Sequence, residues 1–262
     1  MKVSVKYWRS SLAVVMVVMA LIVSTPAVFA DNINPGVLAI NGQVGGLTYG
    51  QWSARWWQYA LSVTTFANCR AEPSGQMWFL AGTTNGRSIA VRNCTVPSGK
   101  NIMFPLFNVE WSVVEAEAQE MKTGTSCPLP DINGDPIKGE DYAALSACAI
   151  AMAQHGTDSN AELEAEVDGV SLNSLTHYRA LSPAPLFTFT TVKGNPFGLC
   201  PTISPCPLRS RAVADGFWII LKSPLPAGKH EIGFEAQVPF FNFFTSGAHY
   251  CLIVLPSNQT CP

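Results

Sequence analysis

The sequence predicts a mainly β fold with helical insertions, namely an antiparallel β-sandwich for which a jelly roll is one candidate topology. About nine short segments of alternating or apolar residues are separated by turns rich in Pro and Gly, as is typical of antiparallel sheets. Two other stretches, one near the mature N-terminus and one at about residues 110–155, space their apolar residues as helices do. We therefore expect a sandwich that carries a Trp-rich N-terminal helix and a helical hairpin.

Residues 1–30 are typical of a secretory signal peptide. Basic residues precede an uninterrupted apolar run at positions 12–23, and small residues follow up to Ala30. The run is shorter than the roughly 17 to 25 residues that cross a bilayer, so we expect cleavage after Ala30 and no transmembrane anchor in the mature protein. Residues 31–262 contain no linker-like stretch, which favours a single domain, located in the periplasm or outside the cell.

The charge and the cysteine content of the mature chain argue against nucleic acid and zinc as partners. Cleavage leaves 13 basic against 18 acidic residues, and no cluster of Lys and Arg indicates nucleic acid binding. Eight cysteines in an exported chain favour disulfides over a zinc site, for which no CxxC pair is present. Since each successive pair brackets a loop or short hairpin, we expect neighbours to pair: Cys69 with Cys94, Cys127 with Cys148, Cys200 with Cys206, and Cys251 with Cys261.

The Trp-rich segment that starts at Thr48 predicts an amphipathic helix. Thr48 and Gln51 fit a capping box, in which each side chain satisfies a backbone donor of the first turn. The tryptophans cover most of the helix surface, which favours a role as core anchors over a stacking surface for a ligand. The narrow polar strip, formed by Arg55 and Gln58 with Trp57 at its flank, is the part that we expect to bind a ligand.

Strands are predicted along most of the remaining chain. The expected strands span residues 36–40, 77–82, 87–92, 101–107, 186–192, 211–222, 229–237 and 248–255. The turn Val96–Lys100 recurs as Leu225–Lys229, and each turn is followed by a strand with Phe at the same offset, Phe104 and Phe234. An Asp-Gly turn also joins two alternating segments within residues 162–172, where we expect a hairpin with its glutamates in solvent.

A helical insertion is predicted between the strand pairs. Residues 110–122 and 141–155 have helical spacing and form the expected helical hairpin. The loop between them holds Asp131, Asn133 and Asp135, which resemble the first half of a calcium loop. The sixth position of that loop is not Gly and the twelfth is not Glu, so these residues are weak metal candidates and a plain Asn-Gly turn is favoured.

A polar and aromatic cluster precedes the strand at 186–192. It contains His177, Tyr178 and Arg179, which could bind an anion or a sugar because Arg donates in pairs and Tyr can stack or donate. The alternative is a packed loop in which Arg179 pairs with a carboxylate. Whether Trp57, Trp111 and Arg179 converge on an open cleft or lie packed would distinguish a binding site from a packed loop.

Candidates for catalysis are few. No Gly-x-Ser-x-Gly motif is present, and disulfides would use every cysteine. Glu110 at the end of an apolar strand is the first carboxylate to consider for a glycosidase, with Glu166 or Asp215 as possible partners, although it could also simply occupy the first turn of the next helix. His177 is the other weak catalytic candidate.

Several motifs resemble those of a group of exported, mostly bacterial proteins of unassigned function. They are GLTYGQWSARWWQYALS (46–62), WFLAGT (78–83), CTVPSGK (94–100) and VDGV (167–170). The similarity spans most of the mature chain. This resemblance implies export and a single domain, and it implies no chemistry or catalytic residue.

The sequence therefore predicts a secreted, disulfide-stabilised binding protein without a cofactor. Its aromatic content and the absence of a catalytic motif favour a carbohydrate or another exported protein as the ligand, bound without catalysis. A hydrolase that acts on envelope or extracellular polymers is one alternative. A structural component of a surface assembly is the other.

Overall fold

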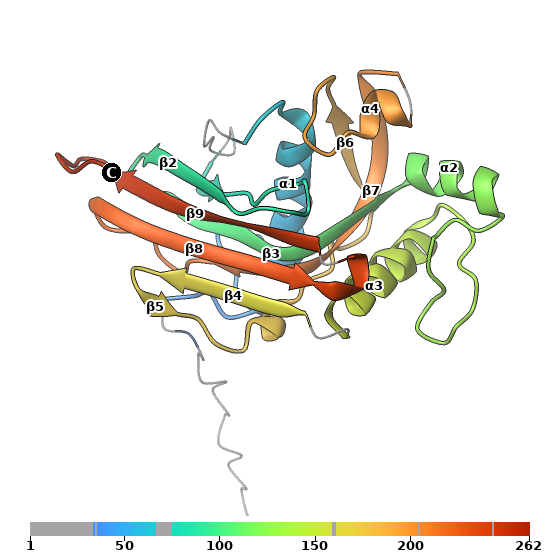
Figure 1. Cartoon of the computed structure of the whole chain (residues 1–262), viewed down its shortest axis with the longest axis horizontal. Coiled ribbons are helices and arrows are strands. Elements are labelled where there is room, and N and C mark those ends of the chain that lie inside the picture. The colour runs from blue at the N-terminus through green and yellow to red at the C-terminus, as the bar shows by residue number, and fades with distance from the viewer. Residues whose placement is uncertain (1–33, 35, 67–74, 159–160, 204, 243) are drawn as a thin grey trace, which may run out of the picture. The chain divides into compact units, whose positions relative to one another are not determined.

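The chain folds into two β-sheets with attached helices, and the computed structural model describes residues 34, 36–66, 75–158, 161–203, 205–242 and 244–262 (Figure 1). The strands are β1 (Met77–Phe79), β2 (Ala90–Val96), β3 (Asn101–Ser112), β4 (Glu162–Val167), β5 (Val170–Ser171), β6 (Phe187–Thr191), β7 (Leu208–Ile220), β8 (Gly228–Val238) and β9 (Phe244–Val254). The helices are α1 (Tyr49–Ser62), α2 (Val113–Thr123), α3 (Tyr142–Asp158) and α4 (Leu199–Thr202), with short 3-10 helices η1 (Leu175–Tyr178) and η2 (Pro239–Phe241). A mainly β fold with helical insertions is thereby confirmed, while the predicted signal peptide lies outside the described residues.

The sheets are mixed rather than purely antiparallel, which corrects the prediction. One sheet has the strand order β1-β3-β7-β6 and the other has the order β2-β9-β8-β4-β5. Most neighbours are antiparallel, but β1 runs parallel to β3 and β2 runs parallel to β9. A hairpin cannot join parallel strands, and the chain between β1 and β3 passes through β2 of the other sheet.

The two sheets share one apolar core. The rings of Phe104 in β3 and Phe234 in β8 stack with their centroids 5.0 Å apart, and the ring of Tyr250 in β9 stacks with that of Phe234 at 6.1 Å. Both phenylalanines are fully buried, and each such burial contributes about 1.5–3 kcal/mol to stability. These are the two phenylalanines that follow the repeated turns, so the similar turns deliver matching residues to opposite sides of the core.

Helix α1 covers part of this core through contacts with β6 and β7. Its predicted capping box is confirmed: the Gln51 backbone N–H donates to Thr48 Oγ1 at 3.4 Å, and the Thr48 N–H donates to Gln51 Oε1 at 3.0 Å. Trp52 and Trp56 are buried and donate their indole N–H groups to backbone carbonyls outside the helix, at 3.0 and 2.8 Å. These two tryptophans act as core anchors.

The helical insertion starts later than the sequence predicts. Glu110 and Trp111 belong to β3, which continues to Ser112, and α2 begins at Val113. The backbone of residues 110–112 pairs with residues 212–214 of β7, and these long-range strand contacts override the helical spacing of the side chains. Both α2 and α3 then contact β3 and β7.

The described disulfides agree with the predicted pairing of sequence neighbours. They join Cys127 to Cys148, Cys200 to Cys206, and Cys251 to Cys261. The first of them ties the loop after α2 to α3. The predicted partner of Cys94, Cys69, lies outside the described residues.

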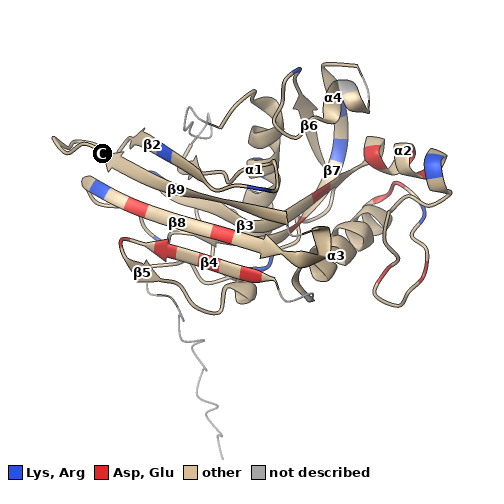
Figure 2. Ribbon diagram, viewed as in Figure 1, with Lys and Arg blue, Asp and Glu red and all other residues tan. Residues whose placement is uncertain are grey.

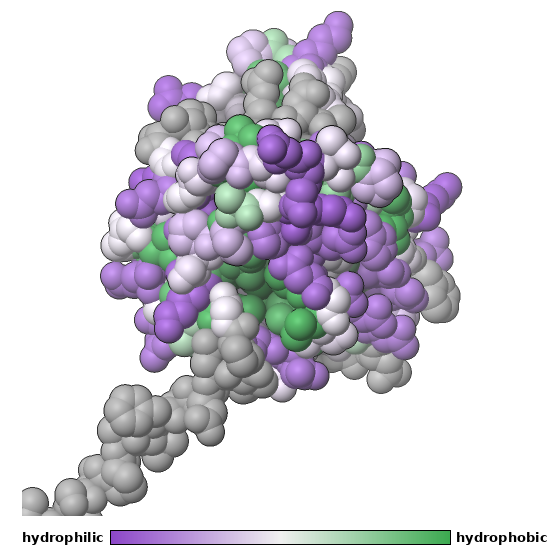
Figure 3. Space-filling model, turned by 90° about the vertical axis from the view of Figure 1, so that its left-hand side faces the viewer, coloured by the Kyte–Doolittle hydropathy of each residue, from purple (hydrophilic) through white to green (hydrophobic). Residues whose placement is uncertain are grey.

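The outer face of the larger sheet is polar. In Figure 2, acidic residues lie along β4 and β8, and Glu164 of β4 lies beside Glu235 of β8. The predicted Asp168-Gly169 turn between β4 and β5 is confirmed, with φ angles of 51° and 76°. In Figure 3, which views the left-hand side of Figure 1, hydrophilic residues cover most of the surface around a hollow with hydrophobic residues.

Candidate functional site

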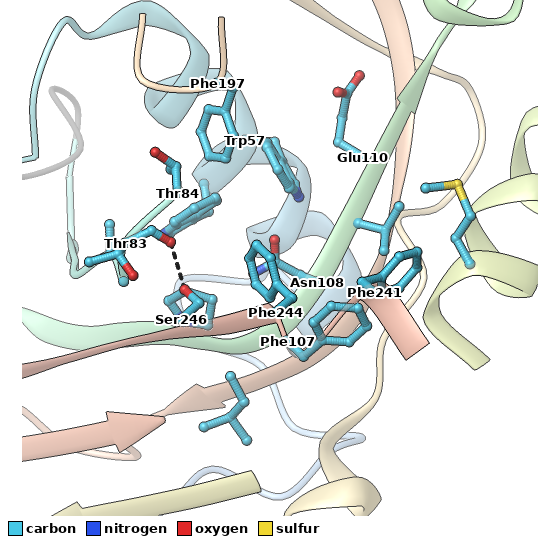
Figure 4. A pocket seen from close by; sticks show the side chains of 17 residues that line it. Trp57, Thr83, Thr84, Phe107, Asn108, Glu110, Phe197, Phe241, Phe244 and Ser246 are labelled. Atoms are coloured by element: carbon cyan, nitrogen blue, oxygen red, sulfur yellow. Dashed lines mark hydrogen bonds between the residues drawn. The ribbon is translucent and has the colours of Figure 1, made fainter. Parts of the chain in front are cut away.

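An aromatic pocket of about 320 Å³ is formed by side chains of both sheets together with α1 and α3 (Figure 4). Its aromatic lining consists of Trp56, Trp57, Phe107, Phe197, Phe241 and Phe244. The rings of Trp57 and Phe197 lie 4.9 Å apart, and Figure 4 shows them separated from the group formed by Phe107, Phe241 and Phe244. Met152 of α3 adds a flexible apolar side chain to the lining.

A β-bulge in β3 shapes this pocket. Leu106 and Phe107 lie opposite a single residue of β7, Phe217. The neighbouring Gly216 has a φ of +151°, and a Cβ at this position would approach Asn108 Cα to 2.4 Å. Because the extra residue re-aims the side chains around it, consecutive rather than alternate residues of β3 reach the pocket.

The hydroxyl groups that line the pocket already make hydrogen bonds within the protein. Thr83 Oγ1 donates to the backbone oxygen of Ser88 at 2.5 Å, and Thr84 Oγ1 donates to that of Pro196 at 3.0 Å. Ser246 Oγ donates to the backbone oxygen of Thr83 at 2.6 Å. Because each of these hydroxyls already donates its proton in a hydrogen bond to a backbone oxygen, it is a poor donor for a ligand.

Two buried polar atoms of the pocket have no hydrogen-bond partner among the described residues. They are Nε1 of Trp57 and Oε1 of Glu110, whose residues are 5% and 9% exposed. The buried unpaired side-chain atoms elsewhere in the described chain lie outside the pocket, on Trp78, Ser146, Thr191 and Trp218. A buried polar group without a partner costs about 1–3 kcal/mol, so these two atoms are unusual features of the pocket lining.

Glu110 forms a carboxyl pair with Glu115 of α2. Burial raises the pKa of Glu110 well above its ordinary value of 4.5, and the nearby charge of Glu115 and the hydrogen bond between the two carboxyls raise it further. Burial also raises the pKa of Glu115, but Ser112 opposes this by donating to Glu115 Oε2 from its backbone nitrogen at 3.0 Å and its hydroxyl at 2.5 Å. Burial and the neighbouring carboxyl thus favour the neutral form of Glu110, whereas Ser112 favours the charged form of Glu115 at the N-terminus of α2.

Of the residues predicted on the polar strip of α1, only Trp57 lines the pocket. The Arg55 guanidinium lies 5.3 Å from the ring centre of Trp52, and Gln58 Nε2 donates to a backbone oxygen of β6 at 2.7 Å. Trp111 donates its indole N–H to the backbone oxygen of Ser126 at 2.9 Å. Arg55, Gln58 and Trp111 lie outside the pocket.

The predicted cluster of three residues at 177–179 does not converge on one site. His177 is exposed, whereas Tyr178 is buried and its hydroxyl accepts a hydrogen bond from Asn34 Nδ2 at 3.0 Å. Arg179 donates to Asp215 Oδ2 from Nε at 2.9 Å and from Nη2 at 2.5 Å. Arg179 is thus committed to an ion pair with a buried carboxylate, and none of the three residues lines the pocket.

The loop considered for calcium is an Asx-type turn. Asp131 Oδ1 accepts hydrogen bonds from the backbone nitrogens of Asn133 at 2.8 Å and Asp135 at 2.9 Å, and these bonds lower the pKa of Asp131. Within the described part of the chain, no group of three or more His, Cys, Asp or Glu side chains is arranged to hold a metal ion.

Sequence reasoning missed several pocket residues that carried a signal. Residues 238–244 read VPFFNFF, an aromatic concentration at a strand boundary that supplies Phe241 and Phe244. Ser112 and Glu115 have the spacing of a capping box, which marks the start of α2 and the partner of Glu110. Phe197, in the loop before α4, carried no comparable signal.

Comparisons with known proteins identify no relative of this chain. No family model, no curated protein and no solved structure matches it. The resemblance to exported proteins of unassigned function therefore stays a prediction. Among the described residues, no helix has the length and apolar character that a membrane span requires.

Proposed function

We propose that this chain is an exported, non-catalytic binding protein that holds a small, mainly apolar molecule in the aromatic pocket. The pocket itself carries this proposal: its volume of about 320 Å³ falls in the range of small-molecule sites, and its lining is largely aromatic. No Lys, Arg or His is found among the described residues that line it. An apolar molecule would be held by contact with the rings, and only a small part of it would need a hydrogen bond.

The same geometry makes a carbohydrate or a protein a poorer ligand for this pocket. A sugar carries a hydroxyl on most of its carbons, whereas the hydroxyls of Thr83, Thr84 and Ser246 are already donated to backbone oxygens. A stable protein partner buries about 800 Å² on each side, and Trp56, Trp57 and Phe107 of this pocket are buried already.

A hydrolase finds little support in the position of the carboxylates. A glycosidase holds its two carboxyl groups about 5–10 Å apart so that the sugar or water fits between them, but Glu110 is hydrogen-bonded directly to Glu115. The other considered partners lie elsewhere, since Glu166 is exposed on β4 and Asp215 is paired with Arg179. Among the described residues that line the pocket, Glu110 thus has no second carboxylate opposite it.

The proposal also includes a β-sandwich architecture and export from the cytoplasm. The shared core of the two sheets supports a β-sandwich, while the parallel edge pairs argue against a simple jelly roll, in which neighbours are antiparallel. The described disulfides support residence in an oxidising compartment, the periplasm or the extracellular space.

The experiment is a binding titration with Nile red, an uncharged apolar dye whose fluorescence rises in an apolar site. Met152→Trp fills the pocket from α3 and should weaken binding at least about tenfold, equivalent to about 1.4 kcal/mol. Met121→Trp is the matched control, because Met121 is 85% exposed on α2 and lies outside the pocket. Equal affinity of both variants would place dye binding elsewhere, and a positive glycan array with no dye binding would favour the carbohydrate alternative.

A further inference from the structure

The indole N–H of Trp57 is a hydrogen-bond donor that lacks an acceptor. Trp57 is 5% exposed, and its Nε1 makes no hydrogen bond to any described residue. The ring is held between those of Trp56 and Phe197, whose centroids lie 5.2 and 4.9 Å away. In Figure 4 the nitrogen-bearing end of the ring is directed toward Asn108, whereas the Glu110 carboxyl points away from it. Because an indole nitrogen donates and does not accept, a ligand at this end of the pocket must supply an acceptor.

The carboxamide of Asn108 is a second polar group that the pocket leaves available. Asn108 lines the pocket and is partly exposed, and its side chain makes no hydrogen bond to a described residue. It directly follows the bulge of β3 and lies opposite Gly216, where a Cβ would approach the Asn108 Cβ to 2.6 Å. The glycine therefore leaves the space that the Asn108 side chain occupies, and the NH₂ group of that side chain offers two donors.

The two groups together fit a single acceptor atom. Trp57 and Asn108 line the same pocket, yet the Trp57 N–H does not bond to the Asn108 oxygen. A carbonyl oxygen has two lone pairs, so it can accept from Trp57 Nε1 and from Asn108 Nδ2 at the same time. A hydrocarbon would leave the buried N–H unpaired, and an anion would find no described Lys, Arg or His in the pocket to offset its burial.

We infer that the pocket binds an uncharged apolar carbonyl compound, namely a ketone, aldehyde or ester, whose oxygen accepts hydrogen bonds from Trp57 Nε1 and Asn108 Nδ2. This inference rests on the proposed function, since it names the ligand class of the same site. It adds a requirement for an acceptor atom, which contact with the aromatic rings alone does not impose.

The test is calorimetric titration of the purified protein at pH 7 with pairs of compounds that differ only in the replacement of C=O by C=CH₂. Acetophenone is paired with α-methylstyrene, and 2-heptanone is paired with 2-methyl-1-heptene. A pocket that offers no hydrogen bond prefers the hydrocarbon, because burial of an unpaired carbonyl costs free energy. In whichever pair binds, we expect the ketone to bind at least as tightly as the hydrocarbon, and tighter binding of the hydrocarbon would overturn the inference.

Two further compounds test the assignment of a carbonyl group. In 1-phenylethanol the oxygen carries a proton, which lacks an acceptor when the oxygen itself accepts from both donors. Benzoate introduces a buried charge. Both compounds should bind more weakly than acetophenone, and equal or tighter binding of either would overturn the assignment.

Variants of the two donors test their roles through the ratio of ketone to hydrocarbon affinity, which cancels losses from altered packing. Trp57→Phe removes the N–H and keeps an aromatic ring, so the ratio should fall about tenfold, as expected for one lost hydrogen bond. Asn108→Leu keeps a side chain of similar size and should also lower the ratio. Trp78→Phe is the matched control, because Trp78 has a buried unpaired indole nitrogen outside the pocket, and it should leave the ratio unchanged. An unchanged ratio in Trp57→Phe or in Asn108→Leu would overturn the inference for that donor.

The infrared spectrum of the bound ketone gives an independent readout. A hydrogen bond to a carbonyl oxygen weakens the C=O bond and lowers its stretching frequency. Acetophenone labelled with carbon-13 at the carbonyl should therefore absorb at a lower frequency when bound to the unaltered protein than when bound to Trp57→Phe. The same frequency in both proteins would overturn the role of the Trp57 N–H.

The remaining outcomes separate the inference from the proposed function. Nile red binding together with a preference for the hydrocarbons would overturn the carbonyl inference and leave the apolar pocket standing. Absence of binding by the dye and by all of these compounds would overturn both proposals. Should Trp57→Phe fail to fold, as judged by its circular dichroism, the comparison of ketone and hydrocarbon on the unaltered protein still supports or overturns the inference.

Discussion

Replacing Glu110 with Gln should make the stability of the protein less dependent on pH. Glu110 is buried, and among the described residues Glu115 of α2 is the titratable group that interacts with it. The neighbouring elements contribute residues that do not titrate: Ala214 of β7 is the strand partner of Glu110, and Met152 of α3 and Trp57 of α1 line the same pocket. Because the pKa of Glu110 is raised on folding, the folded state binds a proton that the unfolded chain releases above the ordinary value of 4.5. The contribution of this proton to stability is therefore complete below a pH of about 4.5 and is lost as the pH rises through the pKa of Glu110 in the folded state.

The magnitude follows from proton linkage. One proton contributes about 1.4 kcal/mol for each pH unit between the unfolded and folded pKa values. For a domain of this size, that slope corresponds to a change in melting temperature of about 3–6 °C per pH unit. The glutamine side chain of the Glu110→Gln variant stays neutral at every pH and can still donate to Glu115, so the variant should lack this contribution and be more stable than the unaltered protein near neutral pH.

Thermal unfolding monitored by circular dichroism at several pH values between about 4.5 and 8 measures this difference. Glu166→Gln is the control, since Glu166 is exposed on β4 and also loses a carboxylate. The Glu110 variant should have a flatter profile than the unaltered protein and the control. Parallel profiles for all three proteins would refute the reasoning, because they would mean that Glu110 ionises alike in the folded and unfolded states.

Further substitutions test the core, an ion pair and a disulfide. Phe104→Ala should lower the free energy of unfolding by about 3–5 kcal/mol in urea titrations, because it leaves a cavity between the sheets; a loss below about 1 kcal/mol would mean that the sheets are not packed on this ring. Asp215→Asn should cost about 1–3 kcal/mol in the same assay, since Arg179 loses its ion pair but is 29% exposed and can reach water, and no loss would contradict the role of this pair. Substituting both Cys127 and Cys148 with Ser should cost about 3 kcal/mol for a loop of 21 residues, and unchanged stability in the oxidised protein would count against that bond.

Local signals in the sequence predicted most of the individual elements. Thr48 and Gln51 marked the start of α1, and Asp168 with Gly169 marked the turn between β4 and β5, because both devices depend on residues close in sequence. The end of β3 was harder to predict. Residues 110–112 have helical spacing, but their pairing with β7, about a hundred residues away, is not visible in a local pattern.

The candidate site was only partly predictable for the same physical reason. Trp57 and Glu110 were singled out, because a large aromatic residue and a carboxylate within an apolar strand are each unusual by themselves. That they line one pocket depends on how α1 packs and on the bulge in β3. Arg179 was weighed both as a ligand-binding residue and as an ion-pair partner, and only the fold brings Asp215 within reach.

The glycine next to the bulge restricts how this pocket can evolve. Any other residue at position 216 would combine a φ of +151° with a contact of 2.4 Å to the backbone of β3, so Gly216 cannot be exchanged without moving the strand that carries Glu110. Phe197 and Phe241, by contrast, come from a loop and a short 3-10 helix, where changes are tolerated more easily. Among descendants of this chain, ligand size should therefore diversify through those phenylalanines while position 216 stays glycine.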